Sequence, residues 1–247
     1  MPRTAVVTGG ASGVGEAICA RLARAGHRVA VLDLSAPAAE RAAAAVRADG
    51  HVAIGIPVDV ADRASVEAAY ATVRAEVGPI EIVVTSAAIA SFVPFEEISA
   101  DLWATTLAVN LTGTFHTVQA AIADMVAGGW GRVVTISSAA GQGPSPRQVH
   151  YSASKAGVIG FTRTLAAEYA NKGITVNTVP PFAVETPMLR AAQEERSLPP
   201  TEHLTRAIPA GRLGTVDDIA AVVAFLCSED AAYITGQVVA ANGGALM

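Results

Sequence analysis

Short runs of β-branched residues alternate with longer alanine-rich stretches along most of the 247-residue chain. The runs have the length of buried strands, and apolar residues between them recur at helical spacing. Strand-like runs are expected at seven places: 4–8, 28–33, 51–56, 80–85, 131–137, 173–179 and 236–240. Helices are expected at about 13–25, 36–50, 62–78, 101–127, in the stretch that carries Tyr151, and at 216–227. This order predicts βαβ units on a parallel sheet.

The regular alternation covers the whole chain, without an internal repeat or a linker. It predicts a single α/β domain over residues 1–247, a doubly wound Rossmann fold with a seven-stranded, mostly parallel sheet and helices on both faces. The one long segment without clear periodicity runs from about 180 to 214. Long segments of this kind in compact domains are usually functional, so we expect it to cover a ligand.

Composition and charge exclude several classes of protein. The chain is 51% hydrophobic and carries a net charge of −5 without a Lys/Arg run, so we expect no nucleic-acid partner. It has neither a signal-peptide pattern nor an apolar run long enough for a membrane span, so we expect no membrane partner and a cytoplasmic location. The cysteines are Cys19 and Cys227, and no Cys/His spacing suits a metal, so we expect neither a disulfide nor a metal site.

A glycine-rich turn, Thr8 to Gly15, follows the first predicted strand and leads into a helix. Glycines allow a tight turn whose N–H groups approach a pyrophosphate at the helix N-terminus, although a simple tight connection would look similar. Asp33 ends the second predicted strand about 20 residues further on, where a carboxylate would accept hydrogen bonds from an adenosine ribose. Strand, turn, helix and carboxylate together predict a dinucleotide site.

Asp33 also bears on which dinucleotide binds. Its carboxylate would repel a 2′-phosphate, and neither Ser12 nor the pair Leu34–Ser35 supplies a basic side chain. We therefore expect NAD(H) in preference to NADP(H). The alternative interpretation of Asp33 is a helix-capping or turn residue.

Tyr151 and Lys155 stand four residues apart in a predicted helix and therefore share one face of it. A phenol has a pKa of about 10, and a neighbouring ammonium favours the phenolate and lowers that pKa. The pair is thus a candidate proton-transfer group. Taken alone, it is also compatible with a half-buried tyrosine beside a solvated lysine.

Together with these two motifs, four further segments make the chain similar, from end to end, to the short-chain dehydrogenase/reductase family. These segments are Asp59-Val60, Val109-Asn110-Leu111, Ile136-Ser137-Ser138 and the loop from Asn177 to Thr186. The closest resemblance is to its 3-oxoacyl reductase-like and hydroxysteroid dehydrogenase-like branch.

The resemblance implies that Tyr151 is the general acid/base and that Lys155 lowers its pKa and holds the nicotinamide ribose. It implies that Ser138 positions the substrate oxygen and that Asn110 anchors a water-linked proton relay. Ser138 is preferred to Ser137 because it lies thirteen residues before Tyr151, the usual spacing in this family.

The resemblance also implies a set of cofactor-binding residues: Gly9, Ser12, Gly13, Val14, Gly15, Asp33, Asp59, Val60, Ser86, Ala87, Ala88, Tyr151, Lys155, Pro181, Val184 and Thr186. The expected substrate pocket is lined by Phe92, Val93, Ala139, Phe182 and Met188, whose apolar side chains favour an apolar substrate. Alternatives remain for three residues: a turn role for Asp59, a core role for Val60 and a helix cap for Thr186.

Two segments depart from the family pattern. Residues 85–88 read Thr-Ser-Ala-Ala where Asn-Asn-Ala-Gly is common, and Phe182 stands where glycine usually follows Pro181. We expect the Phe182 ring to narrow the pocket. His150 is expected at the pocket rim or in solvent, because no G-x-S-x-G elbow supports a hydrolase.

The predicted function is an NAD(H)-dependent oxidoreductase that interconverts a secondary alcohol and a ketone on an apolar substrate, such as a hydroxysteroid or a cyclic or aryl alcohol. The alternatives are a 3-oxoacyl-thioester reductase and, in a different class, a dinucleotide-binding sensor or scaffold with impaired catalysis. The resemblance further implies a homotetramer built through the fourth and fifth helices and the C-terminal segment.

Overall fold

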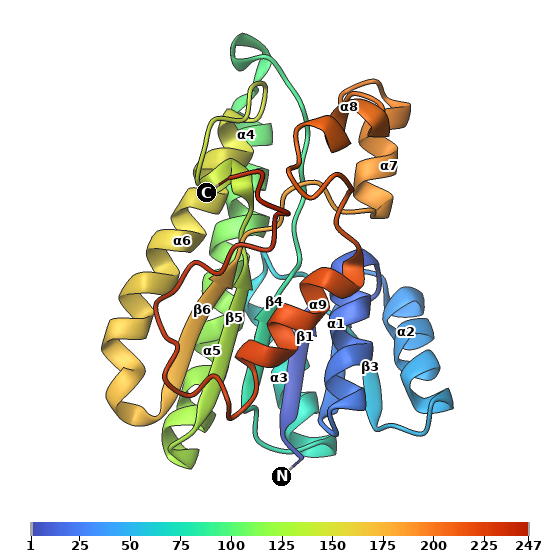
Figure 1. Cartoon of the computed structure of the whole chain (residues 1–247). Coiled ribbons are helices and arrows are strands. Elements are labelled where there is room, and N and C mark those ends of the chain that lie inside the picture. Colours follow the sequence, from blue (N-terminus) through green and yellow to red (C-terminus); the bar gives the residue numbers. More distant parts are fainter. Residues whose placement is uncertain (1, 247) are drawn as a thin grey trace.

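The computed structural model describes residues 2–246, which form a six-stranded sheet in the order β3-β2-β1-β4-β5-β6 (Figure 1). All five strand pairings are parallel. The strands are β1 (Thr4–Thr8), β2 (Arg28–Asp33), β3 (Ala53–Pro57), β4 (Ile82–Thr85), β5 (Gly131–Ile136) and β6 (Ile174–Val179). The order reverses between β1 and β4, and doubly wound sheets bind ligands outside the carboxyl ends of the strands at such a point.

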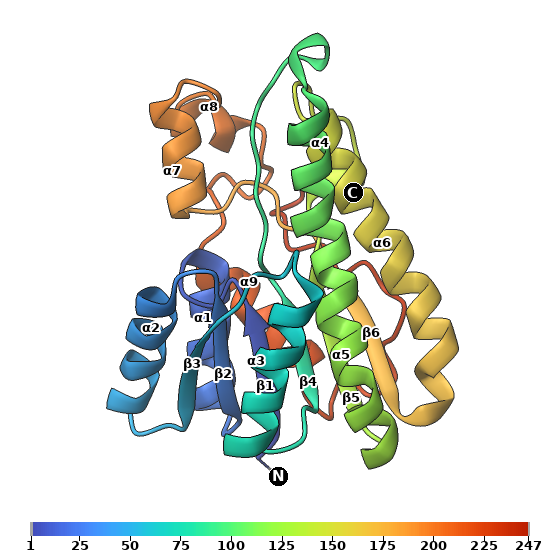
Figure 2. The same cartoon turned by 180° about the vertical axis from the view of Figure 1, so that it is seen from behind.

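Helices cover both faces of this sheet. One face carries α1 (Gly13–Arg24), α2 (Ala36–Ala48) and α9 (Val216–Leu226), which lie in front in Figure 1. The other face carries α3 (Arg63–Glu76), α5 (Gly113–Gly128) and α6 (Val149–Tyr169), which Figure 2 shows from their own side. Successive strand residues alternate between the two cores, as Val6 and Val7 do in β1. The predicted doubly wound α/β fold is confirmed.

The prediction of a seventh strand at 236–240 is wrong. This segment runs beside β6 but makes only one isolated bridge there, between Thr178 and Val238. At one end the Val176 N–H bonds the Thr235 hydroxyl instead of a backbone carbonyl. At the other end the next N–H of β6 would belong to Pro180, which has none. A regular ladder cannot extend in either direction.

The helix expected at 101–127 is three elements in succession. It begins as α4 (Ala100–Leu107), widens into a π-helical turn (Ala108–Thr112) and continues as α5. Asn110 lies in the wide turn, and its carbonyl accepts a hydrogen bond from the Thr114 hydroxyl at 2.9 Å. Such single wide turns are frequently found at functional sites.

The segment 180–214 contains two short helices, α7 (Pro187–Glu194) and α8 (Thr201–Arg206), which lie beyond the carboxyl ends of the strands (Figure 1). Four buried residues form a small core of their own here: Leu189, Leu204, Ile208 and Leu213. Three 3₁₀ turns complete the elements, at Phe95–Glu97, Ala139–Gly141 and Ala170–Lys172.

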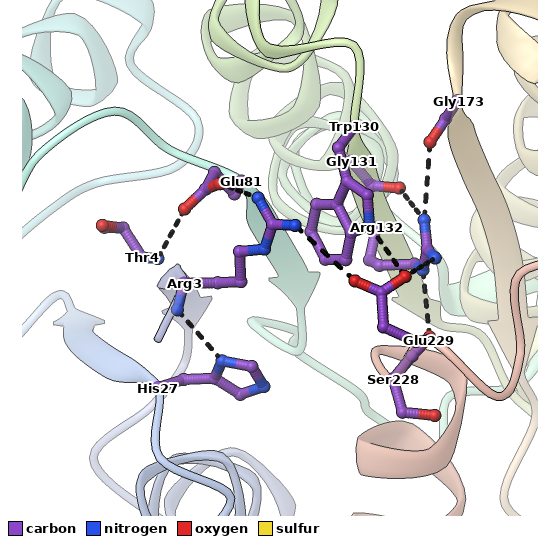
Figure 3. A network of polar contacts seen from close by, with 10 residues as sticks. All are labelled: Arg3, Thr4, His27, Glu81, Trp130, Gly131, Arg132, Gly173, Ser228 and Glu229. Atoms are coloured by element: carbon purple, nitrogen blue, oxygen red, sulfur yellow. Dashed lines mark hydrogen bonds and ion pairs between the residues drawn. The ribbon is translucent and has the colours of Figure 1, made fainter. Parts of the chain in front are cut away.

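A polar network lies at the amino ends of β1 and β5 (Figure 3). Arg132 is only 2% exposed, and its guanidinium donates to the carbonyls of Gly131 at 2.9 Å and Ser228 at 3.2 Å. The guanidiniums of Arg132 and Arg3 both lie over the Trp130 ring, 4.3 and 4.0 Å from its centroid. This network ties the end of α9 to the amino end of β5, away from the carboxyl ends of the strands.

Candidate active site

The glycine turn between β1 and α1 forms a cradle that leaves no space for side chains. Gly9 and Gly13 have φ values of 63° and 54°, a region that favours glycine. A Cβ on Gly15 would lie 2.1 Å from the Gly9 carbonyl oxygen. Ser12 makes no capping hydrogen bond to the first turn of α1, and Val14 packs against the neighbouring core. The helix therefore begins with uncapped N–H groups, which suit an anionic group.

Asp33 lies at the carboxyl end of β2 and is tied to this cradle. Its carboxylate accepts hydrogen bonds from the Ala11 N–H at 3.2 Å and from the Ser35 N–H at 3.3 Å. The guanidinium of Arg41, in α2, donates to the carbonyl of Ala11 at 3.2 Å. This cation was not predicted, because Arg41 lies outside the glycine turn and the residues that directly follow Asp33. A carboxylate and a guanidinium thus border the same edge of the cradle.

Asp59 and Val60 follow β3 and have local roles in the structure. The exposed Asp59 carboxylate accepts the Ala61 N–H at 2.9 Å, which makes it a turn residue. Val60 is 6% exposed and joins the core against Gly113, while its carbonyl lies 3.0 Å from the His116 ring nitrogen Nδ1. Their contact with an adenine stays a prediction.

Residues 85–88 pack directly on the cradle. The N–H groups of Ser86 and Ala87 donate to the Thr8 carbonyl at 3.2 Å and the Thr8 hydroxyl at 3.4 Å. A Cβ on Gly9 would lie 2.8 Å from the Ala87 Cα, so the two backbones are in contact. The half-buried Ala88 follows them toward the loop after β4. The departure from the family pattern here leaves the close packing intact.

Ser138, Tyr151 and Lys155 come together at the carboxyl end of β5. Ser138 follows this strand and caps a 3₁₀ turn through the Ala140 N–H at 3.1 Å, and its hydroxyl lies near enough to the Tyr151 phenol to lower the pKa of that group. The Lys155 ammonium lies one turn along α6, 5.7 Å from the centroid of the Tyr151 ring. It donates to the Ile136 carbonyl at 2.9 Å and is buried. The expected grouping of these three residues is thus present.

Burial governs the proton affinities in this cluster. It lowers the pKa of the Lys155 ammonium to about 8. It raises the pKa of the Tyr151 phenol, and the neighbouring Ser138 hydroxyl opposes that rise. The lowering of the tyrosine pKa by Lys155 that the resemblance implied stays a prediction. The phenol in this structure is therefore a proton donor at neutral pH.

The fully buried Asn110 joins three parts of the site. Its amide oxygen accepts the Ile89 N–H at 2.9 Å, and its amide nitrogen donates to the Ile89 carbonyl at 3.0 Å and to the Ser154 hydroxyl at 3.1 Å. Both amide hydrogens are used in this way, so the side chain fastens the loop after β4 to α6. Its part in a proton relay stays a prediction.

The base of the 180–214 segment reaches both the cradle and the 3₁₀ turn after Ser138. The carbonyl of Pro181 accepts the N–H of the buried Ala139 at 2.9 Å. Thr186 caps α7 through the Leu189 N–H at 3.2 Å, as its alternative interpretation required, and its methyl group lies 3.5 Å from where a Cβ on Gly13 would be. The buried Val184 bridges to Gly214.

Phe182 and Met188 are 41% and 48% exposed. Phe182 lines a cavity of about 250 Å³ together with residues of the C-terminal loop such as Asn242 and Gly243. Its placement beside the nicotinamide stays a prediction.

The other predicted pocket residues, Phe92 and Val93, are held by Arg147. The Arg147 carbonyl accepts the Val93 N–H at 2.8 Å, and its guanidinium donates to the Phe92 carbonyl at 3.0 Å. Arg147 has a φ of 66°, an uncommon conformation for a residue with a side chain. The expectation for His150 is wrong: the ring is 0% exposed, because the loop after β4 covers it.

Residues 2–246 contain no group of three His, Cys, Asp or Glu side chains placed to hold a metal ion. Cys19 and Cys227 are both free and buried. None of the helices within that range has the length and hydropathy needed to cross a membrane.

The cradle, the carboxylate after β2 and the tyrosine–lysine helix define a nucleotide-binding α/β protein with a proton-transfer site. Comparison with known proteins agrees: a family model described as enoyl-(acyl carrier protein) reductase matches residues 9–245. The chain belongs to the short-chain dehydrogenase/reductase family.

Two curated relatives and one solved structure illustrate the similarity. The D-threitol dehydrogenase of Mycolicibacterium smegmatis is 42% identical over 98% of this chain and 92% of its own length. The acetoacetyl-CoA reductase of Rhizobium meliloti is 41% identical over 99% of this chain and 98% of its own length. A crystal structure of an actinorhodin polyketide ketoreductase variant with NADPH has a TM-score of 0.95, with 34% identity over 99% of this chain and 97% of that one.

Proposed function

We propose that this protein is an NAD(H)-dependent oxidoreductase that interconverts a secondary alcohol and a ketone. The observation that carries the proposal is the grouping of Ser138, Tyr151 and the buried Lys155 ammonium at the carboxyl end of β5. Two hydroxyl groups converging on one point can bind a single substrate oxygen and exchange a proton with it.

The cradle fits a dinucleotide, because Gly9 and Gly15 let the backbone pack tightly while the first N–H groups of α1 stay without a side-chain cap. The uncapped start of α1 would hold the pyrophosphate, Asp33 the adenosine ribose and Lys155 the nicotinamide ribose. When bound, the nicotinamide supplies the hydride chemistry.

The residues of the chain supply the proton transfer. Ser138 would donate a hydrogen bond to the oxygen on which negative charge develops, which stabilises the transition state. In ketone reduction the Tyr151 phenol gives its proton to that oxygen, and in alcohol oxidation the phenolate removes it. Because burial raises the pKa of Tyr151, we expect alcohol oxidation to accelerate as the pH rises, while reduction is already supported at neutral pH.

The preference for NAD(H) rests on the Asp33 carboxylate, whose two oxygens already accept backbone N–H groups of the cradle and the following turn. A 2′-phosphate at this point would meet that negative charge. Arg41 lies at the same edge, and its guanidinium would attract a 2′-phosphate. NAD(H) is preferred when the repulsion of that phosphate by Asp33 exceeds its attraction to Arg41.

The predicted pocket residues favour an apolar substrate such as a hydroxysteroid or a cyclic or aryl alcohol, with α7 and α8 covering it. A 3-oxoacyl-thioester reductase is the second candidate. It is favoured by the protonated phenol, which suits reduction, and by the 41% identity to an acetoacetyl-CoA reductase.

The test is NADH formation from NAD, with NADP in parallel, over hydroxysteroids, cyclic and aryl secondary alcohols, polyols and 3-hydroxyacyl thioesters. Tyr151→Phe removes the phenol hydroxyl, and with it the exchangeable proton, while it keeps the ring, so we expect it to lower kcat by at least about 10²-fold while NADH binding persists. A dinucleotide-binding sensor without catalysis would show no turnover to lose. Equal activity of Tyr151→Phe and wild type would refute the assignment of Tyr151.

We further propose that the protein works in the cytoplasm as a homotetramer. Trp103 in α4 and Phe115 in α5 are 38% and 39% exposed on the outer side of the helices that would pair between subunits. A monomer mass in light scattering would contradict this assembly.

A further inference from the structure

The buried histidine beside Tyr151 has an unusual hydrogen-bonding pattern. The Nε2 atom of His150 lies 2.8 Å from the Ser91 hydroxyl oxygen, whereas its Nδ1 atom is buried without a hydrogen-bond partner. The two residues are 59 positions apart in the chain and meet because the loop after β4 covers the start of α6. The proton-transfer site described above does not use either side chain.

The pattern decides which ring nitrogen carries the proton. A neutral imidazole has one N–H donor and one bare acceptor nitrogen. Placing the N–H on Nδ1 would bury a donor without an acceptor, at a cost of about 1–3 kcal/mol. A bare Nδ1 is also unpaired, but proteins tolerate a buried acceptor without a partner more readily than a buried N–H without one, and burial favours the neutral ring because it lowers the pKa of His150. The Nε2–H therefore donates to the Ser91 hydroxyl oxygen.

This assignment leaves the hydroxyl proton of Ser91 available. Ser91 is only half-buried, and within residues 2–246 its one side-chain hydrogen bond is that with His150. The backbone around it is held on both sides, by Asn110 at Ile89 and by Arg147 at Val93. The loop thus presents a fixed hydroxyl donor next to the helix turn that carries Tyr151.

We propose that Ser91 donates a hydrogen bond to a second oxygen of the substrate and that His150 positions its hydroxyl. The substrate would then be a secondary alcohol or ketone with a further hydroxyl or carbonyl oxygen on a nearby carbon, rather than a purely apolar alcohol. This inference rests on the proposed oxidoreductase function and narrows its substrate class. Ser91 acts as a substrate-binding residue and His150 as a positioning residue.

Matched substrates test the inference. Butane-2,3-diol and butan-2-ol share a carbon skeleton and differ by one hydroxyl group, and 3-hydroxyacyl thioesters can be paired with simple secondary alcohols in the same way. We expect Ser91→Ala to lower kcat/KM about tenfold for the substrate with the second oxygen, as for one lost hydrogen bond, and to change the simple alcohol less than about twofold. An equal fall for both members of the pair, or no fall for either, would overturn the proposal.

The role of His150 has its own comparison. His150→Gln keeps an N–H donor near the position of Nε2, whereas His150→Leu removes it. We expect His150→Leu to lower kcat/KM selectively for the substrate with the second oxygen, as Ser91→Ala does. We expect His150→Gln to keep most of the wild-type kcat/KM for that substrate. NADH binding and Tm confirm that both variants are folded. A loss of the same size in both variants would contradict a positioning role.

A readout that needs no turnover separates this inference from the proposed function. Nitrogen-15 NMR of the histidine side chains reports which ring nitrogen of His150 is protonated. The Nε2–H form is expected at pH 7, and the Nδ1–H form would overturn the proposal. Failure of the wild type to oxidise or reduce any substrate of the panel would instead count against the proposed function, while the NMR result would still decide the state of the pair.

Discussion

Lys155 should make the protein less stable at neutral pH, although the proposed chemistry needs it. Burial lowers the pKa of its ammonium from the usual 10.5 to about 8, and the side chain is only 3% exposed. At about 1.4 kcal/mol for each pH unit, burying this charge costs roughly 3 kcal/mol at pH 7. Its hydrogen bond to the Ile136 carbonyl returns about 1 kcal/mol.

We therefore expect Lys155→Met to be more stable than the wild type at pH 7 by about 2 kcal/mol, which corresponds to a Tm rise of about 4–8 °C. The folded wild type holds the Lys155 proton less tightly than the unfolded chain does. Unfolding then takes up a proton between about pH 8 and pH 10.5, and wild-type stability rises with pH across that window. The advantage of the variant should vanish there, while its activity should be lost at every pH.

Urea unfolding of both proteins from pH 7 to pH 10 measures this difference. Lys172 is the other lysine of the chain and is exposed, so Lys172→Met is the matched control, with an expected change under about 0.5 kcal/mol. A constant difference between Lys155→Met and wild type across the pH range would refute the reasoning.

Two further predictions concern charged residues in contrasting settings. Asp33→Ala should raise the ratio of kcat/KM with NADP to kcat/KM with NAD at least about tenfold, because the repelling carboxylate is gone. Adding Arg41→Met to this variant should return the ratio to its wild-type value. A ratio that stays raised in the double variant would show that the Arg41 guanidinium does not hold the 2′-phosphate. Arg132→Met should lower the free energy of unfolding by about 3–5 kcal/mol because it leaves buried carbonyls unpaired. Arg212→Met breaks an exposed ion pair with Asp218 and a hydrogen bond to the Leu213 carbonyl, and should cost about 1 kcal/mol. Equal losses in the two variants on urea unfolding would contradict this distinction.

Features that depend on local sequence were predicted well. The alternation of apolar runs determines the α/β class, because each strand and helix must bury one side. The glycine turn is readable because its positive φ values and close backbone contacts suit only glycine, as at Gly9. Tyr151 and Lys155 share a face of α6 because their spacing is one helical turn.

Features that depend on partners from distant parts of the chain were not predictable. The segment 236–240 forms no seventh strand, because Pro180 has no N–H and the Thr235 hydroxyl accepts the N–H of Val176. Both effects arise only when this segment lies beside β6. The Arg41 side chain reaches the cradle only after α2 has packed on the sheet. His150 is buried only because the loop carrying Ser91 folds across it.

The sequence alone thus determined the fold class, the glycine turn and the Tyr151–Lys155 pair, since these follow from backbone conformation and from spacing within one element, while the other candidate site residues came from the family resemblance. The tertiary structure decided the number of strands, the raised pKa of Tyr151 and the pairing of Ser91 with His150. Desolvation and side-chain hydrogen bonds depend on what surrounds a group in space, and those surroundings exist only when separate elements have assembled.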